Sequence, residues 1–476
     1  AKQLNVIMLP WCAFGHMLPF RLVAVAMARC GVKVTYVSSP KNIARLPKIP
    51  PPLEHLLAYV DLPFAANSNG IDPLDGGEAT VDIPMDKQNL LKVAFDSLRA
   101  PFEDLLLKLS PDWVMYDIMG DWAADIAAEH GVKSMFLNIF SATAASFLGN
   151  PDCYNPLDRA RLRPDCASLT RPPPWYEFPS TVAFTMQEAM MHYPMLYTED
   201  PAKKKDSERL YRAITLPNAV ASRTCLEYEG PYVAAYRKTL RKPVVPLGLL
   251  LPDEVAKENG KREWEGELKK TFDWLDEQEP RSVVFVSFGS ELKMSKEFIE
   301  ELAYGLEKSG LPFLWALRRP SWAQEDADAF PEGFLERVSG RGTVSFGWSP
   351  QLEILAHGSV GGSLFHSGWG SIIETLQFGH TMILLPTIFD QPLNARLLVE
   401  KGIGVEVQKR DDGSFTREDV CRALTFAMLS EEGKELREKT RDIGERVFGN
   451  RKLQDEYMQK FVDFLVSDVE VIANGH

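Results

Sequence analysis

Short apolar runs alternate with amphipathic stretches along the first part of the chain. Residues 5–10 contain the apolar run Val-Ile-Met-Leu and predict a buried strand, and residues 11–16 predict a loop. A helix is predicted over residues 18–30, ended by Gly31, and residues 32–37 predict the next strand. Because a strand, a helix and another strand follow one another, the pattern indicates a parallel β-α-β unit.

The same alternation continues for about two hundred residues. We predict, in chain order, one helix over 87–109, a strand over 113–116, a helix over 122–130, a strand over 134–137 and a last strand over 219–222. Residues 150–205 interrupt this order with three consecutive prolines and several methionines. We interpret residues 150–205 as a partly helical insertion over a pocket, or alternatively as a surface segment with no role in ligand binding.

A second pattern of strands and helices follows a polar connection. Residues 242–246 and the charged stretch 252–267 predict a linker. The elements expected after it are a strand over 282–288, a helix over 297–309, strands over 313–317 and 360–365, a helix over 372–378, a strand over 405–407 and helices within 417–448. Their order indicates a second β-α-β domain.

The length of 476 residues is too great for one hydrophobic core, so two domains are the natural count. We expect an N-terminal domain at 1–245, a linker at 246–267 and a C-terminal domain at 268–450. The last helix carries an apolar stripe that needs a partner surface, formed by Tyr457, Phe461 and Leu465. Residues 451–476 are therefore expected to pack back on the N-terminal domain, and the fold class is α/β with two doubly wound, Rossmann-like domains.

The composition excludes several classes of function. The net charge of −13 argues against a protein that binds nucleic acid, because the surface that contacts nucleic acid is normally basic. There is no run of 18 apolar residues and no apolar signal segment, so we expect neither a membrane span nor secretion. The six cysteines are scattered without a C-x-x-C pair, which fits reduced thiols in the cytoplasm and gives no metal signal. We expect a monomer.

The stretch 360–378 has the pattern of an anion-binding site. A small apolar strand opens through a Gly/Ser turn into a helix, whose N-terminus presents unpaired N–H groups and partial positive charge. Gly368 and Gly370 let the backbone approach a phosphate, and His366 and Ser371 can add donors. Glu374 lies one turn further along the helix and could accept from ribose hydroxyls. Upstream, Trp348 offers a flat surface for a base.

This stretch resembles the signature box of plant UDP-sugar-dependent glycosyltransferases. The resemblance rests on residues at fixed spacing over 348–391, namely Trp348, Pro350, Gln351, Leu355, His357, Gly361, His366, Gly368, Trp369, Ser371, Glu374, Gly379, Pro386, Asp390 and Gln391. One position departs from the family pattern, because Gly370 stands where the family most often has an Asn that contacts the diphosphate. That contact is lost or replaced here.

The resemblance implies a GT-B fold, in which two doubly wound domains face each other with the nucleotide sugar in the cleft. It implies that the N-terminal domain, residues 1–245, binds the acceptor and that the C-terminal domain, residues 268–450, binds the UDP-sugar. It also implies the UDP-sugar-binding residues, namely Ser290, Trp348, Gln351, His366, Gly368, Trp369, Gly370, Ser371, Glu374, Asp390 and Gln391. In the family the last two bind the hydroxyls of the donor sugar. No metal and no separate cofactor are expected, since the UDP-sugar is a co-substrate. The acidic string at 326–328 is expected to be a solvated turn rather than a metal site.

Sugar transfer to an alcohol needs a base that removes the hydroxyl proton. His16 is the candidate, because it follows the first strand at the carboxyl end of a parallel sheet, where α/β proteins bind ligands. A carboxylate on the other ring nitrogen would fix the tautomer and stabilise the imidazolium. The family motif implies Asp117 for this role, and Asp121, four residues onward, is the rival.

The stretches 10–19, 39–47 and 79–84 resemble the branch of this family that extends sugar chains on steviol, triterpenoid and flavonoid glycosides. We therefore expect inverting, metal-independent transfer, with glucose as the first candidate, to a sugar hydroxyl of an existing glycoside. The alternatives are transfer to an aglycone hydroxyl, and UDP-rhamnose or another UDP-sugar as donor. A non-catalytic carrier of small molecules is a different class of function. A nicotinamide dehydrogenase fits less well, because the Gly402-Ile-Gly404 string lacks a third glycine.

Overall fold

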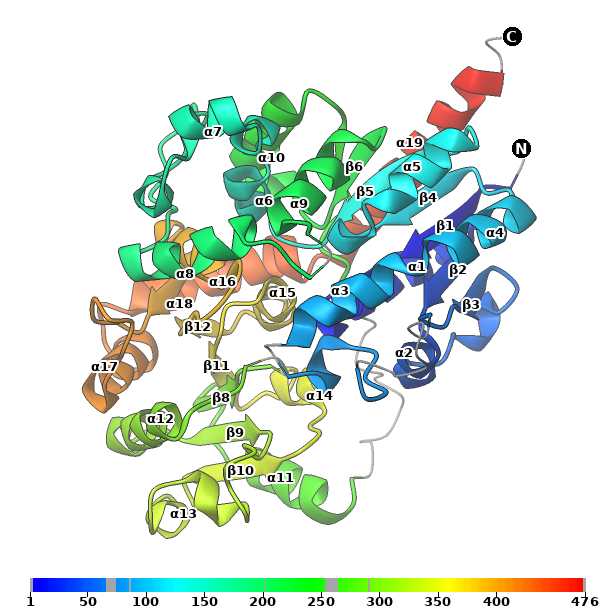
Figure 1. Cartoon of the computed structure of the whole chain (residues 1–476). Coiled ribbons are helices and arrows are strands. Elements are labelled where there is room, and N and C mark those ends of the chain that lie inside the picture. The colour runs from blue at the N-terminus through cyan, green and yellow to red at the C-terminus, as the bar shows by residue number, and fades with distance from the viewer. Residues whose placement is uncertain are drawn as a thin grey trace. The chain divides into compact units, whose positions relative to one another are not determined.

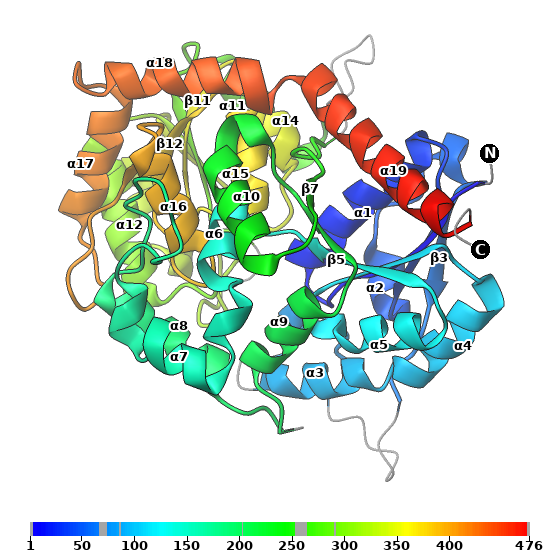
Figure 2. The same cartoon turned by 90° about the horizontal axis from the view of Figure 1, so that it is seen from above.

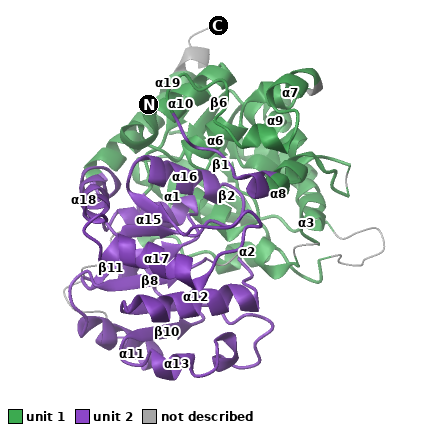
Figure 3. Cartoon of the chain, turned by 90° about the vertical axis from the view of Figure 1, so that its left-hand side faces the viewer, with its two compact units in different colours: residues 1–179, 190–250, 452–476 green, residues 180–189, 251–451 purple. Residues whose placement is uncertain are grey.

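Parallel β-sheets form the framework of the protein. The structure is a computed structural model, and it describes residues 3–65, 74–84, 87–201, 203–252, 264–289 and 292–473. The chain divides into two compact units (Figure 3). Unit 1 comprises residues 1–179, 190–250 and 452–476, and unit 2 comprises residues 180–189 and 251–451. No described helix is long and apolar enough to cross a membrane.

The sheet of unit 1 is entirely parallel and, within the described residues, has seven strands in the order β3-β2-β1-β4-β5-β6-β7 (Figure 1). The strands are β1 (Asn5–Leu9), β2 (Lys33–Ser38), β3 (Leu57–Asp61), β4 (Trp113–Tyr116), β5 (Lys133–Asn138), β6 (Ala219–Ser222) and β7 (Val244–Pro246). The chain winds outward from β1 in one direction and then from β4 in the other, which is a doubly wound topology.

Helices cover both faces of this sheet. Val6 and Met8 of β1 point into one apolar layer with helices α1 (Phe14–Arg29) and α19 (Arg451–Ala473). Ile7 and Leu9 point into the other layer with α3 (Gln88–Asp96), α4 (Arg99–Leu109) and α5 (Trp122–Glu129). This alternation follows from the two-residue period of a strand, and Figure 2 shows α1 and α19 on the same side of the sheet.

Helix α19 finds its partner surface in unit 1. Phe461 and Leu465 are fully buried in the layer that contains α1. The carbonyl oxygen of Leu465 accepts a hydrogen bond from Trp113 Nε1 at 3.2 Å. The hydroxyl of Tyr457 accepts from the backbone N–H of Leu226 at 2.8 Å and contacts Glu227. The apolar stripe of this helix is therefore part of the core of unit 1.

Unit 2 repeats the same topology. Its described strands form a parallel sheet in the order β10-β9-β8-β11-β12-β13. They are β8 (Val283–Ser287), β9 (Phe313–Leu317), β10 (Gly342–Phe346), β11 (Val360–Phe365), β12 (Thr381–Leu384) and β13 (Gly404–Glu406). Val284 and Val286 face α12 (Lys296–Ser309) and α17 (Arg417–Met428), whereas Val283 and Phe285 face α11 (Gly266–Asp276).

The remaining helices connect these strands. In the N-terminal half they are α2 (Pro40–Arg45), α6 (Ala142–Leu148), α7 (Pro156–Leu162), α8 (Met186–Tyr197), α9 (Asp206–Thr215) and α10 (Leu226–Leu240). In unit 2 they are α13 (Phe334–Arg337), α14 (Gln351–Leu355), α15 (Trp369–Leu376), α16 (Gln391–Glu400) and α18 (Lys434–Ile443). Helix α8 has its first four residues in unit 2 and the rest in unit 1.

Several predicted elements are wrong in their boundaries. The helix predicted over 372–378 is α15 (Trp369–Leu376), so Gly370 and Ser371 lie in its first turn and not in the preceding loop. Helix α1 begins at Phe14, not at residue 18, so His16 lies in its first turn and not in a loop. The helix predicted over 87–109 is broken between α3 and α4, because Pro101 clashes with the carbonyl of the residue four positions earlier in a continuous helix. Residues 242–246 are not linker, since Val244–Pro246 forms the edge strand β7, where proline is tolerated.

Each sheet reverses its winding direction beside its first strand. The reversal falls between β1 and β4 in unit 1, and between β8 and β11 in unit 2. In open α/β sheets, ligands bind outside the carboxyl ends of the strands at this reversal. The residues that follow these four strands are therefore the first candidates for binding and catalysis.

Candidate active site

His16 and Asp117 meet at the reversal point of unit 1. Strands β1 and β4 are neighbours with Leu9 opposite Tyr116, so the residues that follow them share one end of the sheet. Asp117 comes directly after β4, and His16 lies in the first turn of α1. Nδ1 of His16 is 2.8 Å from Oδ2 of Asp117. The structure thus joins two residues that are 101 positions apart in the sequence.

Backbone donors fix the orientation of the Asp117 carboxylate. Its Oδ2 also accepts from the backbone N–H of Trp11 at 3.0 Å, and its Oδ1 accepts from that of Ile118 at 2.7 Å. The side chain of Asp117 is 1% exposed, whereas that of His16 is 17% exposed. The ring of Phe140 lies edge-on to the imidazole at 5.5 Å. A carboxylate on Nδ1 places the ring proton there, so the basic lone pair of His16 is on Nε2.

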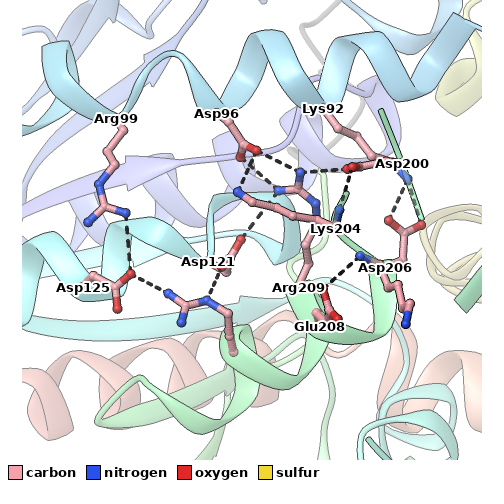
Figure 4. A network of polar contacts seen from close by, with 12 residues as sticks. Lys92, Asp96, Arg99, Asp121, Asp125, Asp200, Lys204, Asp206, Glu208 and Arg209 are labelled. Carbon is pink, nitrogen blue, oxygen red and sulfur yellow. Dashed lines mark hydrogen bonds and ion pairs between the residues drawn. The ribbon is translucent and has the colours of Figure 1, made fainter. Parts of the chain in front are cut away.

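Asp121, the rival partner for His16, is directed elsewhere. Its Oδ2 accepts from Arg212 Nε at 2.7 Å, and its Oδ1 lies 3.7 Å from Arg209 (Figure 4). Burial raises the pKa of the Asp121 carboxyl, and hydrogen bonding to Arg212 opposes that shift. The structure therefore assigns Asp117, and not Asp121, to the histidine.

Asp121 belongs to a partly buried charge network that the sequence did not predict (Figure 4). Its centre is Arg209, which is 1% exposed and makes two hydrogen bonds of 2.9 Å to Asp96 and one of 3.1 Å to Asp200. The network ties α3, α5 and α9 together beside the end of β4. Further pairs around it are Lys204–Asp96, Arg212–Asp125, Arg99–Asp125, Arg99–Glu129 and Lys92–Asp206.

In unit 2 the turn after β11 leads into the N-terminus of α15. Gly368 is the N-cap residue and has no side chain that could cap the helix. Gly370 and Ser371 lie in the first turn of the helix. Gly379, predicted as the cap at the other end, has a φ of 62°. The N-terminal end of α15 has the geometry expected of an anion site.

His366 lies against two glycines from two different strand ends. A Cβ atom on Gly368 would lie 2.7 Å from His366 Nε2, and one on Gly289 would lie 3.1 Å from its Cε1. Both glycines therefore leave room for the imidazole. Burial lowers the pKa of His366 to about 4, so the ring is neutral near neutral pH and carries one N–H donor.

Residues predicted to hold the nucleoside lie on α14 and α15. Gln351 Nε2 donates to Glu374 Oε2 at 2.7 Å, which brings these two predicted ligands together. Ser287, the last residue of β8, approaches Gln351 with its hydroxyl at 3.5 Å. Trp348 is 71% exposed, an unusual exposure for so large an aromatic side chain, and leaves its face accessible for stacking.

Asp390 and Gln391 stand at the start of α16. Gln391 Oε1 accepts from the N–H of Thr387 at 3.0 Å, from its hydroxyl at 2.8 Å and from the N–H of Ile388 at 3.0 Å. Asn394 donates to Asp390 Oδ2 at 2.8 Å and to the carbonyl of Ser367 at 3.0 Å. Asn394 therefore joins α16 to the turn after β11. The sequence did not predict this role, because Ser367 lies 27 positions from Asn394.

The indole of Trp369, a predicted ligand, belongs to the core. Its side chain is 4% exposed and packs edge-on against Phe448 at 6.4 Å, so only its backbone N–H lies at the helix terminus. Ser290 lies outside the described residues. The acidic string at 326–328 forms a short turn in which Asp328 accepts from the N–H of Glu325 at 2.8 Å. No cluster of three metal-ligating side chains occurs among the residues that the structure describes.

Comparisons with known proteins identify the family of this chain. The family model of UDP-glucoronosyl and UDP-glucosyl transferases matches residues 266–436. Soyasaponin III rhamnosyltransferase of Glycine max is 40% identical over 470 residues, which is 98% of this chain and 96% of that one. Anthocyanidin-3-O-glucoside rhamnosyltransferase of Petunia hybrida is 31% identical over 489 residues, covering 98% and 97%. The chain belongs to the family of plant UDP-sugar-dependent glycosyltransferases.

A solved structure supports the fold. UGT73P12 of Glycyrrhiza uralensis, in complex with glycyrrhetinic acid 3-O-monoglucuronide, matches with a TM-score of 0.78 and 23% identity over 100% of this chain and 98% of that one. At this identity the likeness concerns the fold alone. The predicted class, α/β of the GT-B type with two Rossmann-like domains, is confirmed.

Proposed function

We propose that the protein transfers a sugar from a UDP-sugar to a hydroxyl group of a small plant natural product, with inversion and without a metal ion. The observation that carries this proposal is the 2.8 Å contact between His16 and Asp117 at the reversal point of unit 1. A non-catalytic carrier would need a pocket, but it would not need an oriented histidine–carboxylate pair there.

His16 acts as the general base. Its Nε2 takes the proton of the acceptor hydroxyl while the hydroxyl oxygen forms a bond to the anomeric carbon, and UDP leaves with the electron pair of the bond that breaks. Attack on the face opposite the leaving group inverts the anomeric centre. Asp117 stabilises the imidazolium that forms, because its carboxylate lies on the other ring nitrogen.

Unit 2 supplies the donor site in this proposal. Trp348 stacks on the uracil, and the joined pair of Gln351 and Glu374 holds the uracil edge and the ribose hydroxyls. The diphosphate lies at the N-terminus of α15, where the backbone N–H groups, His366 and Ser371 stabilise its charge. Asp390 and Gln391 take the sugar hydroxyls, so the UDP-sugar serves as co-substrate and no separate cofactor is invoked.

We further propose that the acceptor is already glycosylated. The support is the resemblance to the branch that extends sugar chains, together with the names of relatives such as anthocyanidin-3-O-glucoside rhamnosyltransferase. For the donor, glucose remains the first candidate and rhamnose the second. The names of both relatives described above are the support for rhamnose as the second candidate.

One screen tests the acceptor and the donor together. UDP-glucose and UDP-L-rhamnose are each incubated with flavonoid and triterpenoid aglycones and with their monoglycosides, and products are identified by mass. We expect mass gains of one hexose or one deoxyhexose, faster on the monoglycosides. Faster transfer to the aglycones would contradict the acceptor proposal. Binding of UDP without transfer to any hydroxyl compound would favour a carrier over an enzyme.

A further inference from the structure

Segment 180–189 belongs to unit 2 although the residues on either side of it in the sequence belong to unit 1 (Figure 3). It contains the buried residues Val182 and Phe184 and ends in the first turn of α8. In the sequence it lies within the insertion 150–205, in the half of the chain that we assign to the acceptor. Unit 2, in which we propose the donor site, therefore includes a segment of the N-terminal part of the chain.

The start of the segment is held at the C-terminal end of α16. Glu400, the last residue of this helix, accepts three hydrogen bonds at its Oε2. The donors are the hydroxyl of Ser180 at 3.0 Å, the backbone N–H of Thr181 at 2.5 Å and the hydroxyl of Thr181 at 3.0 Å. Charge-assisted hydrogen bonds of this kind are the stronger ones in proteins, so this contact fixes one end of the segment to α16.

The end of the segment is held at the middle of the same helix. The carboxylate of Glu188 is 3% exposed and lies 3.1 and 3.3 Å from the guanidinium of Arg396. The same carboxylate accepts from the backbone N–H of Thr185 at 2.8 Å, and the Thr185 hydroxyl accepts from the N–H of Glu188. This reciprocal pair is a capping box. The buried side chain of Glu188 thus caps the N-terminus of α8 and also forms an ion pair with Arg396 of α16.

A second contact leads from Glu188 toward the donor-sugar residues. Lys409 Nζ lies 3.8 Å from Glu188 and donates to the carbonyl of Pro386, in the loop that precedes Asp390. Arg396 also contacts Glu406 of β13. Burial raises the pKa of Glu406 and lowers that of Lys409, and the charge interaction between the two groups opposes both shifts. Each charged form therefore stabilises the other. Removing the charge of Glu188 leaves the cations of Arg396 and Lys409 to share the carboxylate of Glu406 in this group.

We propose that segment 180–189 is a positioning element of the donor-sugar site. Glu188, with Ser180 and Thr181, holds α16 and the preceding loop so that Asp390 and Gln391 meet the sugar. This inference rests on the proposed function. Gln351, Glu374 and the diphosphate site stand on α14 and α15, and α16 contacts the turn before α15 through Asn394 and the carbonyl of Ser367. The segment therefore acts first on recognition of the sugar, and its effect on recognition of UDP should be the smaller one.

The test compares two ligands on the full chain. Dissociation constants for UDP and for the UDP-sugar, UDP-glucose or UDP-L-rhamnose, are measured by calorimetry without acceptor. In Glu188→Gln the ratio of the UDP-sugar constant to the UDP constant should rise by about 2- to 30-fold, the range that such couplings span. The constant for UDP itself should stay within about twofold. A smaller rise is expected in Ser180→Ala/Thr181→Val, which leaves the buried pair intact.

Glu307→Gln is the matched control, because Glu307 pairs with Arg337 between α12 and α13 of the same unit and at the surface. Its ratio should equal that of the wild type. An unchanged ratio in Glu188→Gln, or an equal loss for both ligands, overturns the inference. If Glu188→Gln does not fold, an unchanged ratio in the double variant overturns it. Failure of the wild type to bind either ligand would instead refute the proposed function.

Discussion

Replacement of Asp117 by asparagine keeps the shape of the side chain and removes its charge. In the native structure one carboxylate oxygen serves His16 and the N–H of Trp11, and the other serves the N–H of Ile118. An amide has only one acceptor oxygen. Whichever way the new amide turns, a backbone N–H of either Trp11 or Ile118 faces the NH₂ group and loses its acceptor.

Two magnitudes follow from this geometry. A buried donor that loses its acceptor costs about 1–3 kcal/mol of stability, which lowers the melting temperature by about 2–4 °C per kcal/mol in a unit of this size. The transfer rate should fall by about 10²–10⁴, because the imidazolium of His16 loses its anionic partner and its tautomer is no longer fixed. UDP affinity should not change, since Asp117 lies in unit 1 and the proposed nucleotide site in unit 2.

The assay measures initial transfer rates, a melting curve and calorimetric UDP binding for Asp117→Asn beside Asp121→Asn. Asp121 is similarly buried but serves Arg212 and Arg209, so its variant should lose stability more than rate. A rate of Asp117→Asn within about threefold of the wild type, less than the smallest expected general-base effect, would refute the reasoning. A larger rate loss in Asp121→Asn would move the partner role to that residue.

Two further predictions concern unit 2. Gly370→Asn, in the first turn of α15, should retain activity and tighten UDP binding, because an Asn donor to a charged group contributes about 1.5–3 kcal/mol; a weaker calorimetric affinity with an unchanged melting temperature would refute this. Burial lowers the pKa of His366 to about 4 and that of His380 to about 3, both below the ordinary value near 6.5, so the unfolded chain binds protons more readily. Stability present above about pH 6.5 should therefore fall as the pH drops to about 5, and an unchanged urea midpoint between about pH 7 and pH 5 would contradict it.

Most strands were predictable because their signal is local. The runs at 113–116, 219–222, 313–317 and 360–365 are short and apolar, and the structure has strands at the same residues. Helix ends were harder to predict. Gly15 lies in the first turn of α1 and Pro19 follows it, and both residue types normally indicate a break in a helix. The helix nevertheless continues, because Met17 and Phe20 are fully buried in the core.

Long-range partners were not predictable from periodicity. The pairing of His16 with Asp117 came from the family resemblance, and no local pattern distinguishes Asp117 from Asp121. The network around Arg209 joins it to Asp96, which is 113 positions away, and such pairs leave no trace in a single sequence. Trp369 was predicted as a ligand by its place in the motif, but its indole is buried, because a motif position does not tell whether side chain or backbone is used.

The most direct test of the central claim is the His16→Ala variant. Because the proposed base touches the acceptor and not the nucleotide, the variant should lose about 10²–10⁴ in transfer rate, the usual contribution of a general base, while its calorimetric affinity for UDP stays within about twofold. Transfer at a rate close to that of the wild type, with UDP still bound, would remove His16 from the mechanism.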